Sequence, residues 1–339
     1  MTSARILVVG PAWVGDMVMA QSLFLLLRAR WPDRELDVIA PPATYPLLAR
    51  MPEVAQAVPL LAPHGRLALR HRLALGWNLR PRRYEQALVL PRSYKSALPA
   101  WTSGARRRTG FLGEARWGLL NDIRHEPPGH KMRTVDRFLM LGLEPDESLP
   151  AVIPPRLVTD PDGGYAVLKR LGVARPERVL ALCPGAEYGP AKRWPARHFA
   201  TLAKNYQAQG WQIWLMGGPR DQEAAQAVQA LSESACVDLT GRTTLLEAVD
   251  LLGLATAVVS NDSGLMHVAA AMGLPLVAVF GSSDPEHTPP LDPRAIALSL
   301  RLSCSPCFAR HCPLGHLQCL EGLTPERVEQ AIQAVLGAF

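Results

Sequence analysis

The sequence has no long hydrophobic run. No uninterrupted apolar stretch in its 339 residues reaches the roughly 18 residues that a membrane-spanning helix needs. The first ten residues, MTSARILVVG, lead directly into an expected strand and lack the apolar core and cleavage site of a secretion signal. We therefore expect a cytoplasmic protein. Its length favours about two domains of ordinary size.

The two common nucleotide-binding motifs are also missing. Residues 10–16, GPAWVGD, contain Gly10 and Gly15 but not the G-x-G-x-x-G pattern that lets a backbone approach a pyrophosphate. The expected second strand ends in VIAPP, without an Asp or Glu for a ribose, and no G-x-x-x-x-G-K-[ST] loop occurs. These absences argue against a dinucleotide-dependent dehydrogenase.

Acidic residues are scarce in the first half of the chain. Residues 1–170 contain 24 Lys and Arg against 15 Asp and Glu, whereas residues 171–339 contain 12 against 15. The first half is therefore +9 and the second −3. This asymmetry indicates an anionic partner of the first half, such as nucleic acid, a membrane surface or an acidic substrate. An ordinary solvated, Arg-rich surface is the alternative.

Hydrophobic runs and helical patterns alternate along the chain, which predicts an α/β protein with parallel sheets. The pattern restarts after a Pro-rich passage at residues 149–164, so we expect domains at 1–160 and 161–339 that meet near residues 155–170. The expected strands lie at residues 5–10, 36–40, 86–90, 179–185, 212–218, 236–241, 256–262 and 275–281.

Polar groups follow four expected strands of the second half. The stretch SNDSG at 260–264 supplies good helix caps, and its helix start would also bind an anion. The other strand ends carry PGAEYGPAKRWP with Lys192, GGPRD, and TGRTT with Thr243 and Thr244. Ligands gather at the carboxyl ends of parallel strands. Together these groups predict a nucleotide diphosphate site, with the phosphates against Lys192 and the helix start at Ser263 and Gly264.

Two further side chains have both a functional and an ordinary interpretation. Asp16 follows Gly15 in the first expected loop. It is either a helix-capping carboxylate or a general base that faces a cleft. His267 lies three residues into the helix that begins near Gly264. It is either a packed residue or a second contact to phosphate or sugar.

The remaining motif is a cysteine-rich segment, CSPCFARHCPLGHLQC. Cys304 and Cys307 have the spacing of a metal knuckle. The spacing of Cys312 and Cys319 fits no standard zinc motif. In a cytoplasmic protein we favour reduced thiols that pack a loop, and we assign no metal.

Four motifs in the same order resemble the bacterial lipopolysaccharide heptosyltransferases: VGPAWVGDMVMAQSL, CPGAEYGPAKRWP, SNDSGLMHVAAAMG and CSPCFARHCPLGHLQCL. The resemblance runs essentially end to end. It implies a glycosyltransferase-B fold, with two Rossmann-like domains facing across a cleft. It also implies an inverting, metal-independent transfer of L-glycero-D-manno-heptose from ADP-heptose to the first heptose of the lipopolysaccharide inner core. A heptosyltransferase for a different core acceptor is the alternative.

The resemblance also implies residue roles. Asp16 matches the proposed general base, Lys192 a lysine that contacts donor phosphate, and Asp262 a carboxylate that hydrogen-bonds the donor heptose. The phosphate-binding turn corresponds to Ser263, Gly264, Leu265 and His267. We group Tyr188, Thr243 and Thr244 with these donor-binding candidates. The family has an acidic residue near the GGPRD turn. Arg220 and Asp221 occupy that neighbourhood here, and the register of the match is ambiguous.

The expected acceptor is a Kdo-containing lipid A core, whose phosphates and carboxylates would explain the basic first half. No cofactor and no nucleic acid partner are expected. Residues 66–83, RLALRHRLALGWNLRPRR, have no acidic residue and are typical of a membrane-surface segment, or of an ordinary Arg-rich helix. We therefore expect peripheral binding to the cytoplasmic face of the inner membrane. The candidate acceptor-binding residues are Arg92, Lys95, Arg106, Arg107, Arg108, Arg124, Lys131 and Arg133.

Overall fold

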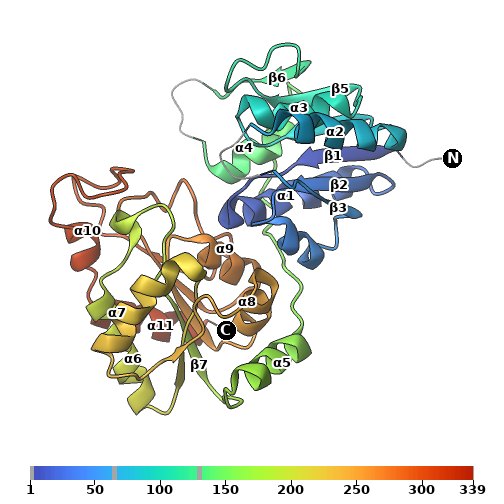
Figure 1. Ribbon diagram of the computed structural model, residues 1–339. Coiled ribbons are helices and arrows are strands. Elements are labelled where there is room, and N and C mark those ends of the chain that lie inside the picture. Colours follow the sequence, from blue (N-terminus) through green and yellow to red (C-terminus); the bar gives the residue numbers. More distant parts are fainter. Residues whose placement is uncertain (1–3, 63–66, 128–131, 339) are drawn as a thin grey trace. The chain divides into compact units, whose positions relative to one another are not determined.

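The structure is a computed structural model that describes residues 4–62, 67–127 and 132–338. The chain divides into two compact units, Met1–Pro155 (unit 1) and Arg156–Phe339 (unit 2) (Figure 1). The division lies between residues 155 and 156, whereas the sequence pattern placed it between residues 160 and 161.

Unit 1 is built on a six-stranded parallel sheet with the order β3-β2-β1-β4-β5-β6. Its strands are β1 (Arg5–Val9), β2 (Glu35–Ala40), β3 (Gln56–Pro59), β4 (Gln86–Val89), β5 (Arg107–Phe111) and β6 (Asp122–Arg124). Its helices are α1 (Val14–Arg30), α2 (Leu69–Leu79), α3 (Tyr94–Thr102) and α4 (Thr134–Leu141), with short 3-10 helices η1 (Tyr45–Arg50) and η2 (Arg80–Arg82).

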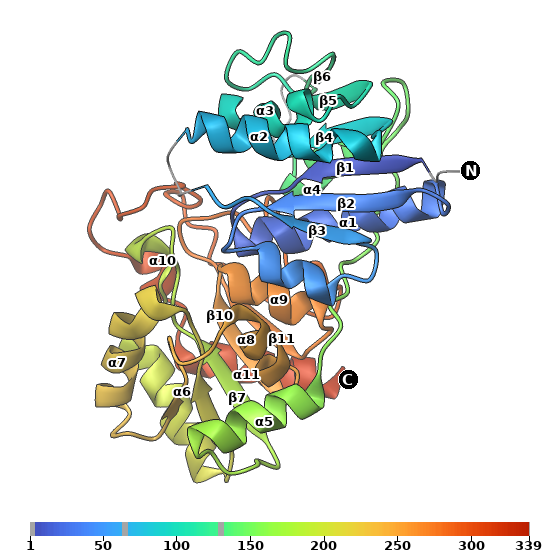
Figure 2. The ribbon, with the colours of Figure 1, turned by 45° about the vertical axis from the view of Figure 1, so that its right-hand side comes forward.

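Helices cover both faces of this sheet because both faces of its central strands are apolar. Leu7 and Val9 of β1 share a core with Ala97 and Leu98 of α3, and the alternate residues of β1 are equally buried. Successive side chains of a strand point to opposite faces, so such a strand needs a cover on each side. The packed pair α2 and α3 lies along one side, and α1 packs with α4 (Figure 2).

Unit 2 repeats this architecture with the strand order β12-β11-β10-β7-β8-β9, also all parallel. The strands are β7 (Val179–Cys183), β8 (Gln212–Leu215), β9 (Val237–Asp238), β10 (Ala257–Asn261), β11 (Leu276–Val279) and β12 (Ile296–Leu298). The helices are α5 (Pro161–Leu171), α6 (Ala196–Ala208), α7 (Gln222–Leu231), α8 (Leu245–Leu252), α9 (Gly264–Ala271), α10 (Gln318–Glu321) and α11 (Pro325–Gly337), with η3 (Pro190–Lys192) and η4 (Pro219–Asp221).

The last helix belongs to the core of unit 2. Val328, Ile332 and Val335 of α11 are buried with strand residues such as Val277, and α11 packs against β11 and α6. The expected α/β class with two Rossmann-like parallel sheets is confirmed. Among the described residues, no helix is both long and apolar enough to cross a membrane.

Each sheet has one point at which the strand order reverses. In unit 1 it lies between β1 and β4, and in unit 2 between β7 and β10. The loops that follow these two strands diverge there, which leaves space for a ligand at their carboxyl ends. The candidate residues can therefore be sought at these two places.

Candidate active site

The reversal point of unit 2 joins the two segments that the sequence singled out. The loop after β7 contains residues 184–195, and residues 262–264 follow β10 directly. The side chain of Asn261, at the end of β10, connects them. Its Oδ1 accepts from the backbone N–H of Trp194 at 2.9 Å, and its Nδ2 donates to the Pro184 carbonyl at 2.7 Å. Asn261 is fully buried, so it holds the loop rather than a ligand.

This clamp places Lys192 and Asp262 against each other. The distance from Lys192 Nζ to Asp262 Oδ2 is 2.5 Å, and the two side chains are 19% and 4% exposed. Lys192 Nζ also lies 5.2 Å from the ring centroid of Tyr188, whose hydroxyl donates to the Phe308 carbonyl at 2.7 Å. A cation that is mostly shielded from water interacts strongly with an anion placed beside it.

The start of α9 lies directly beside this ion pair. Ser263 is its N-cap residue, but no side chain caps the helix. The Ser263 hydroxyl instead lies 3.2 Å from that of Ser260. The first-turn N–H groups of α9, from Gly264 and Leu265 onward, therefore keep their capacity to bind an anion. Ser263 occupies the N-cap position, but its side chain does not cap the helix, and the anion-site interpretation is consistent with the geometry.

His267 has no ionic role at neutral pH. It is 5% exposed, and this burial lowers the pKa of its imidazole to about 4 despite the opposing effect of the Asp262 carboxylate. A neutral imidazole can hydrogen-bond a ligand but adds no charge to a phosphate site.

The two threonines contribute less than expected to this site. Thr244 is the N-cap of α8: its Oγ1 accepts from the backbone N–H of Glu247 at 3.3 Å, and the Glu247 carboxylate accepts from the N–H of Thr244 at 2.8 Å. This reciprocal capping occupies the hydroxyl, so its prediction as a donor-binding residue loses support. Thr243 is half-buried, one residue outside the cap.

Arg220 and Asp221 of the GGPRD turn lie in different environments. Arg220 is exposed and pairs with Glu187. Asp221 is partly buried, and its Oδ2 accepts a hydrogen bond from the N–H of Gly218 at 2.9 Å. Burial raises the pKa of the Asp221 carboxyl. A Cβ atom at Gly185 would lie 2.1 Å from this carboxyl group. Glycine at this position, just after β7, therefore leaves the room that Asp221 needs.

In unit 1 Asp16 lies near the end of β1, at the reversal point of that sheet. It belongs to the first turn of α1, which begins at Val14, so it is a helical residue rather than the loop residue that the sequence predicted. The side chain is half-buried. The positive end of the helix dipole stabilises a carboxylate there.

Four of the expected acceptor-binding arginines are engaged within unit 1. Arg107 and Arg108 lie on strand β5 rather than in a loop. Arg107 pairs with Asp122 and Glu144, which raises its pKa. Arg108 donates to the carbonyls of Leu119 and Ala105. Arg124 and Arg133 pair with Asp122 and Asp136, respectively. These guanidinium groups already have partners within unit 1, which weakens their prediction as acceptor ligands.

Three other basic candidates lie on the surface of unit 1. Arg92 follows β4 at the reversal point and pairs with Glu126 at 2.6 Å while remaining half exposed. Lys95 lies in the first turn of α3, and Arg106 is exposed before β5. Lys131 lies outside the described residues.

Arg116 shapes the loop after β4, and no pattern in the sequence singles it out. Arg116 is fully buried, and burial lowers its pKa to about 10. It donates to the carbonyls of Pro91, Leu112 and Phe111. In the sequence, Arg116 resembles the many other arginines of the basic first half, which are expected on the surface.

Comparison with known proteins identifies the family. The family model described as glycosyltransferase family 9 (heptosyltransferase) matches residues 72–318. The chain belongs to glycosyltransferase family 9. It is therefore a glycosyltransferase, and the family resemblance seen in the sequence is confirmed.

Individual relatives extend this likeness over the whole chain. Lipopolysaccharide heptosyltransferase 2 of Escherichia coli strain K12 is 41% identical and aligns with 98% of each chain. Lipooligosaccharide heptosyltransferase 2 of Haemophilus influenzae is 42% identical over 87% of this chain and 88% of its own. The solved structure of the E. coli ADP-heptose lipopolysaccharide heptosyltransferase II matches with a TM-score of 0.88, 40% identity and 98% coverage of both chains. The glycosyltransferase-B fold is thereby confirmed.

The buried His267 makes the stability of this glycosyltransferase depend on pH. Its folded-state pKa of about 4 lies below the ordinary 6.5, so the unfolded chain takes up a proton first as the pH falls. The stability tied to this group is complete above pH 6.5 and is lost toward pH 4. Between pH 7 and pH 5 we expect a loss of about 2 kcal/mol.

Urea unfolding at the two pH values, followed by circular dichroism, measures this loss. His267→Gln removes the titrating group and should lose less stability on acidification by about that amount. His311→Gln, at an exposed histidine, serves as control and should behave like the parent. Equal acid sensitivity of the His267 variant and the parent would contradict the assignment.

Proposed function

We propose that this chain transfers L-glycero-D-manno-heptose from ADP-heptose to the first heptose of the lipopolysaccharide inner core, heptosyl-Kdo2-lipid A. Two relatives that share 41% and 42% of its residues over most of their length are heptosyltransferases 2. The observation that carries the proposal is the Lys192–Asp262 pair beside the uncapped start of α9. Lys192 supplies a cation, the start of α9 supplies backbone N–H donors, and Asp262 supplies a carboxylate that accepts hydrogen bonds from hydroxyl groups.

The diphosphate and the heptose of the donor each have a matching group in unit 2. The diphosphate of ADP-heptose binds the first-turn N–H groups of α9 and Lys192. As the phosphate replaces Asp262 as partner of Lys192, the carboxylate is released to accept a hydrogen bond from a heptose hydroxyl. Tyr188 packs its ring against the same lysine and borders the phosphate position.

The transfer is an inverting displacement in this proposal. The acceptor hydroxyl attacks the anomeric carbon from the face opposite ADP, and Asp16 takes its proton as general base. Asp16 lies in the first turn of α1 and is half-buried, so its carboxylate is the proton acceptor in this proposal. The departing ADP gains negative charge, which Lys192 and the N–H groups of α9 stabilise without a catalytic metal ion.

The acceptor binds unit 1 in this account. Arg92 and Lys95 follow β4 at the reversal point, where Asp16 also lies, and Arg106 adds an exposed charge. They are suited to the phosphates and carboxylates of a Kdo-containing core because their charges remain accessible. Arg107, Arg108, Arg124 and Arg133 already have partners within unit 1 and are not assigned to the acceptor.

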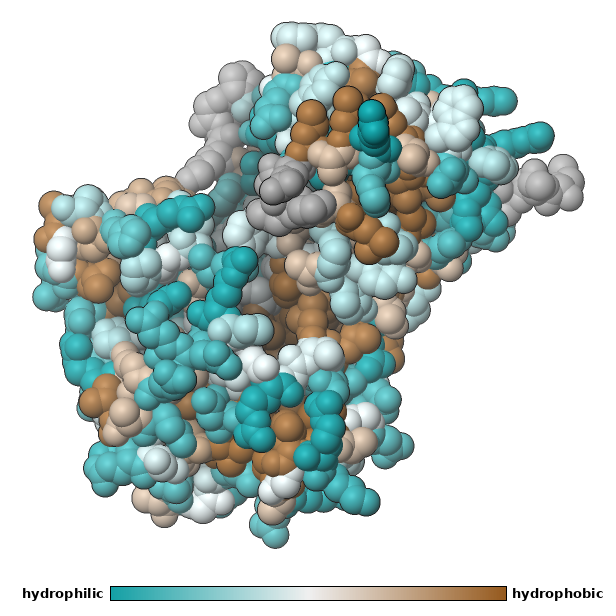
Figure 3. Space-filling model, viewed as in Figure 1, coloured by the Kyte–Doolittle hydropathy of each residue, from teal (hydrophilic) through white to brown (hydrophobic). Residues whose placement is uncertain are grey.

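We further propose that α2 binds the cytoplasmic face of the inner membrane. Leu67, Leu69 and Trp77 are 50%, 44% and 61% exposed, and Figure 3 shows hydrophobic side chains gathered over α2 and α3. Arg70 and Arg80 are exposed among them. Exposed apolar side chains with flanking cations are the features by which a helix lies on an anionic lipid surface.

The acceptor series tests the proposed function. The protein is incubated with ADP-heptose and truncated cores bearing zero, one or two heptoses, and the products are weighed by mass spectrometry. Only the core with one heptose should gain one more. Transfer to the core without heptose, or none to any core, would contradict the proposal.

The same assay tests the general base. Asp16→Asn keeps a capping oxygen but loses the proton acceptor, so turnover should fall at least about a hundredfold. Asp162→Asn makes the same change in the first turn of α5 and should leave turnover unchanged. Turnover of Asp16→Asn within a few-fold of the parent would exclude Asp16 as the base.

Flotation with vesicles that contain anionic lipid tests the membrane surface. The double variant Leu69→Ser, Trp77→Ser should bind about tenfold more weakly, because it removes two exposed apolar side chains. Trp117→Ser changes a comparably exposed tryptophan outside α2 and should bind like the parent. Equal binding of the double variant and the parent would contradict the role of α2.

A further inference from the structure

The cysteine-rich loop has no regular secondary structure of its own. It runs from the end of β12 at Leu298 to the start of α10 at Gln318. Leu300 and Leu302 pack against the core of unit 2, whereas Phe308 and Leu314, between the cysteines, are 38% and 61% exposed. A structureless connection of this length within a compact unit is uncommon and usually has a function.

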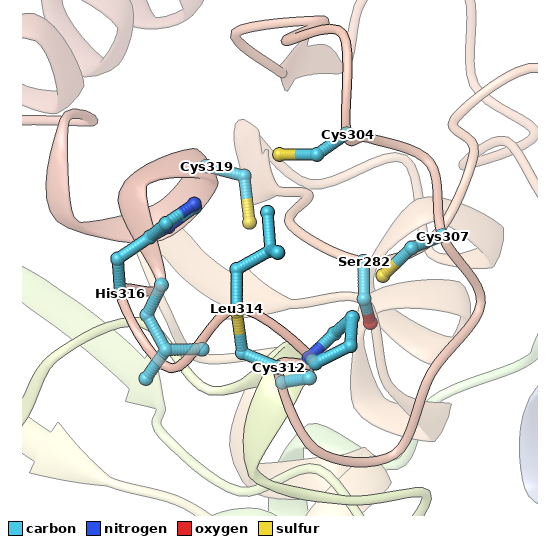
Figure 4. Close-up of a pocket in the computed structure, with 10 residues that line it drawn as sticks. Ser282, Cys304, Cys307, Cys312, Leu314, His316 and Cys319 are labelled. Carbon is cyan, nitrogen blue, oxygen red and sulfur yellow. The ribbon is translucent and has the colours of Figure 1, made fainter.

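The four thiols of the loop surround one pocket. Cys304, Cys307, Cys312 and Cys319 line it together with Ser282 and His316 (Figure 4), and none of the four is in a disulfide. Ser282 is 1% exposed, and its hydroxyl has no hydrogen-bond partner. A buried hydroxyl without a partner is unfavourable, and this one lies beside the thiols (Figure 4).

Cys312 lies at the start of a tight turn. The N–H of Gly315 donates to the Cys312 carbonyl at 3.1 Å. Positive φ angles at Gly315 (72°) and Leu317 (49°) curl the chain. The turn brings Cys312 and His316 to the same pocket.

The donor set of this pocket is chemically specific. No Asp or Glu occurs between Asp292 and Glu321, so oxygen-preferring ions such as Mg²⁺ and Ca²⁺ have no carboxylate ligand in the loop. Four cysteine sulfurs are a common ligand set of structural zinc. Reduced thiols that merely pack the loop leave the buried Ser282 hydroxyl without a hydrogen-bond partner.

We propose that Cys304, Cys307, Cys312 and Cys319 bind one Zn²⁺ ion, and that the zinc loop so formed positions the donor-binding loop at residues 184–195. Among the described residues, no three His, Cys, Asp or Glu side chains are arranged to hold a metal. Binding therefore requires rotation of the accessible thiols of Cys304, Cys307 and Cys312 toward Cys319. Each thiol that becomes a ligand releases its proton to solvent.

The link to the donor-binding loop is a set of direct contacts. Tyr188 donates to the Phe308 carbonyl, and Ala191 N–H donates to the Arg310 carbonyl at 3.1 Å. A Cβ atom at Gly189 would lie 2.6 Å from that same carbonyl oxygen. The segment of the zinc loop between Cys307 and Cys312 thus packs directly against Tyr188 and the residue before Lys192. This positioning role rests on the proposed function, whereas the metal site does not.

Metal analysis of freshly purified, untagged full-length protein tests the site. We expect about one zinc per chain, and a loss of that zinc in Cys304→Ser and Cys312→Ser. Cys236→Ser changes a buried cysteine outside the loop and should retain it. Replacement by Co²⁺ should give the intense near-ultraviolet absorption of cobalt bound to thiolates. Metal-free parent protein that also fails to take up Co²⁺, iron in place of zinc, or full zinc content in Cys312→Ser would overturn the assignment.

ADP binding separates this site from the donor site. Calorimetry should show about tenfold weaker ADP binding in Cys312→Ser than in Cys236→Ser. Zinc binding with unchanged ADP affinity in Cys312→Ser would retain the metal site and overturn its positioning role. A parent protein that binds zinc but not ADP would contradict the proposed function and leave the metal site supported.

Discussion

The ion pair between Lys192 and Asp262 is the interaction on which the donor site depends. It joins the loops after β7 and β10, two neighbouring parallel strands between which the strand order reverses. A largely buried ion pair adds little net stability, yet removing one partner costs about 3–5 kcal/mol because the other charge is left without compensation. The pair is thus poorly explained as a stabilising element. It is well explained as a charge arrangement that a diphosphate can take over.

The same reasoning accounts for the basic first half of the chain. An excess of nine positive charges suggests many anion contacts. However, Arg107, Arg108, Arg116 and Arg124 bind carboxylates or backbone carbonyls within unit 1. Guanidinium groups have five donors each and readily serve to satisfy buried acceptors. Net charge therefore overstates the number of side chains that can hold an acceptor.

The central strands and the general location of the site could be predicted from the sequence, because both leave strong patterns. Runs such as RILVV and VLALC are apolar on both faces, and the polar residues follow at the strand ends. Among the short outer strands, β9 was predicted at residues 236–241, but others were not. Strand β5 reads RRTGF, and its first two residues are only partly buried, so it has no apolar pattern. Side-chain partners were also out of reach. Asn261 and Thr244 are residue types that often bind ligands. Only the fold shows that Asn261 holds a loop and that Thr244 caps a helix.

The central claim is that Lys192 exchanges Asp262 for the phosphates of the donor. Calorimetry of ADP binding to the parent, Lys192→Ala and Asp262→Asn tests it, with circular dichroism to verify folding. Lys192→Ala should weaken binding about ten- to a hundredfold, through the loss of a charge-assisted contact of about 1.5–3 kcal/mol. Asp262→Asn removes the competing carboxylate and should bind ADP at least as tightly as the parent. Equal losses in both folded variants, or parental affinity in Lys192→Ala, would contradict the account.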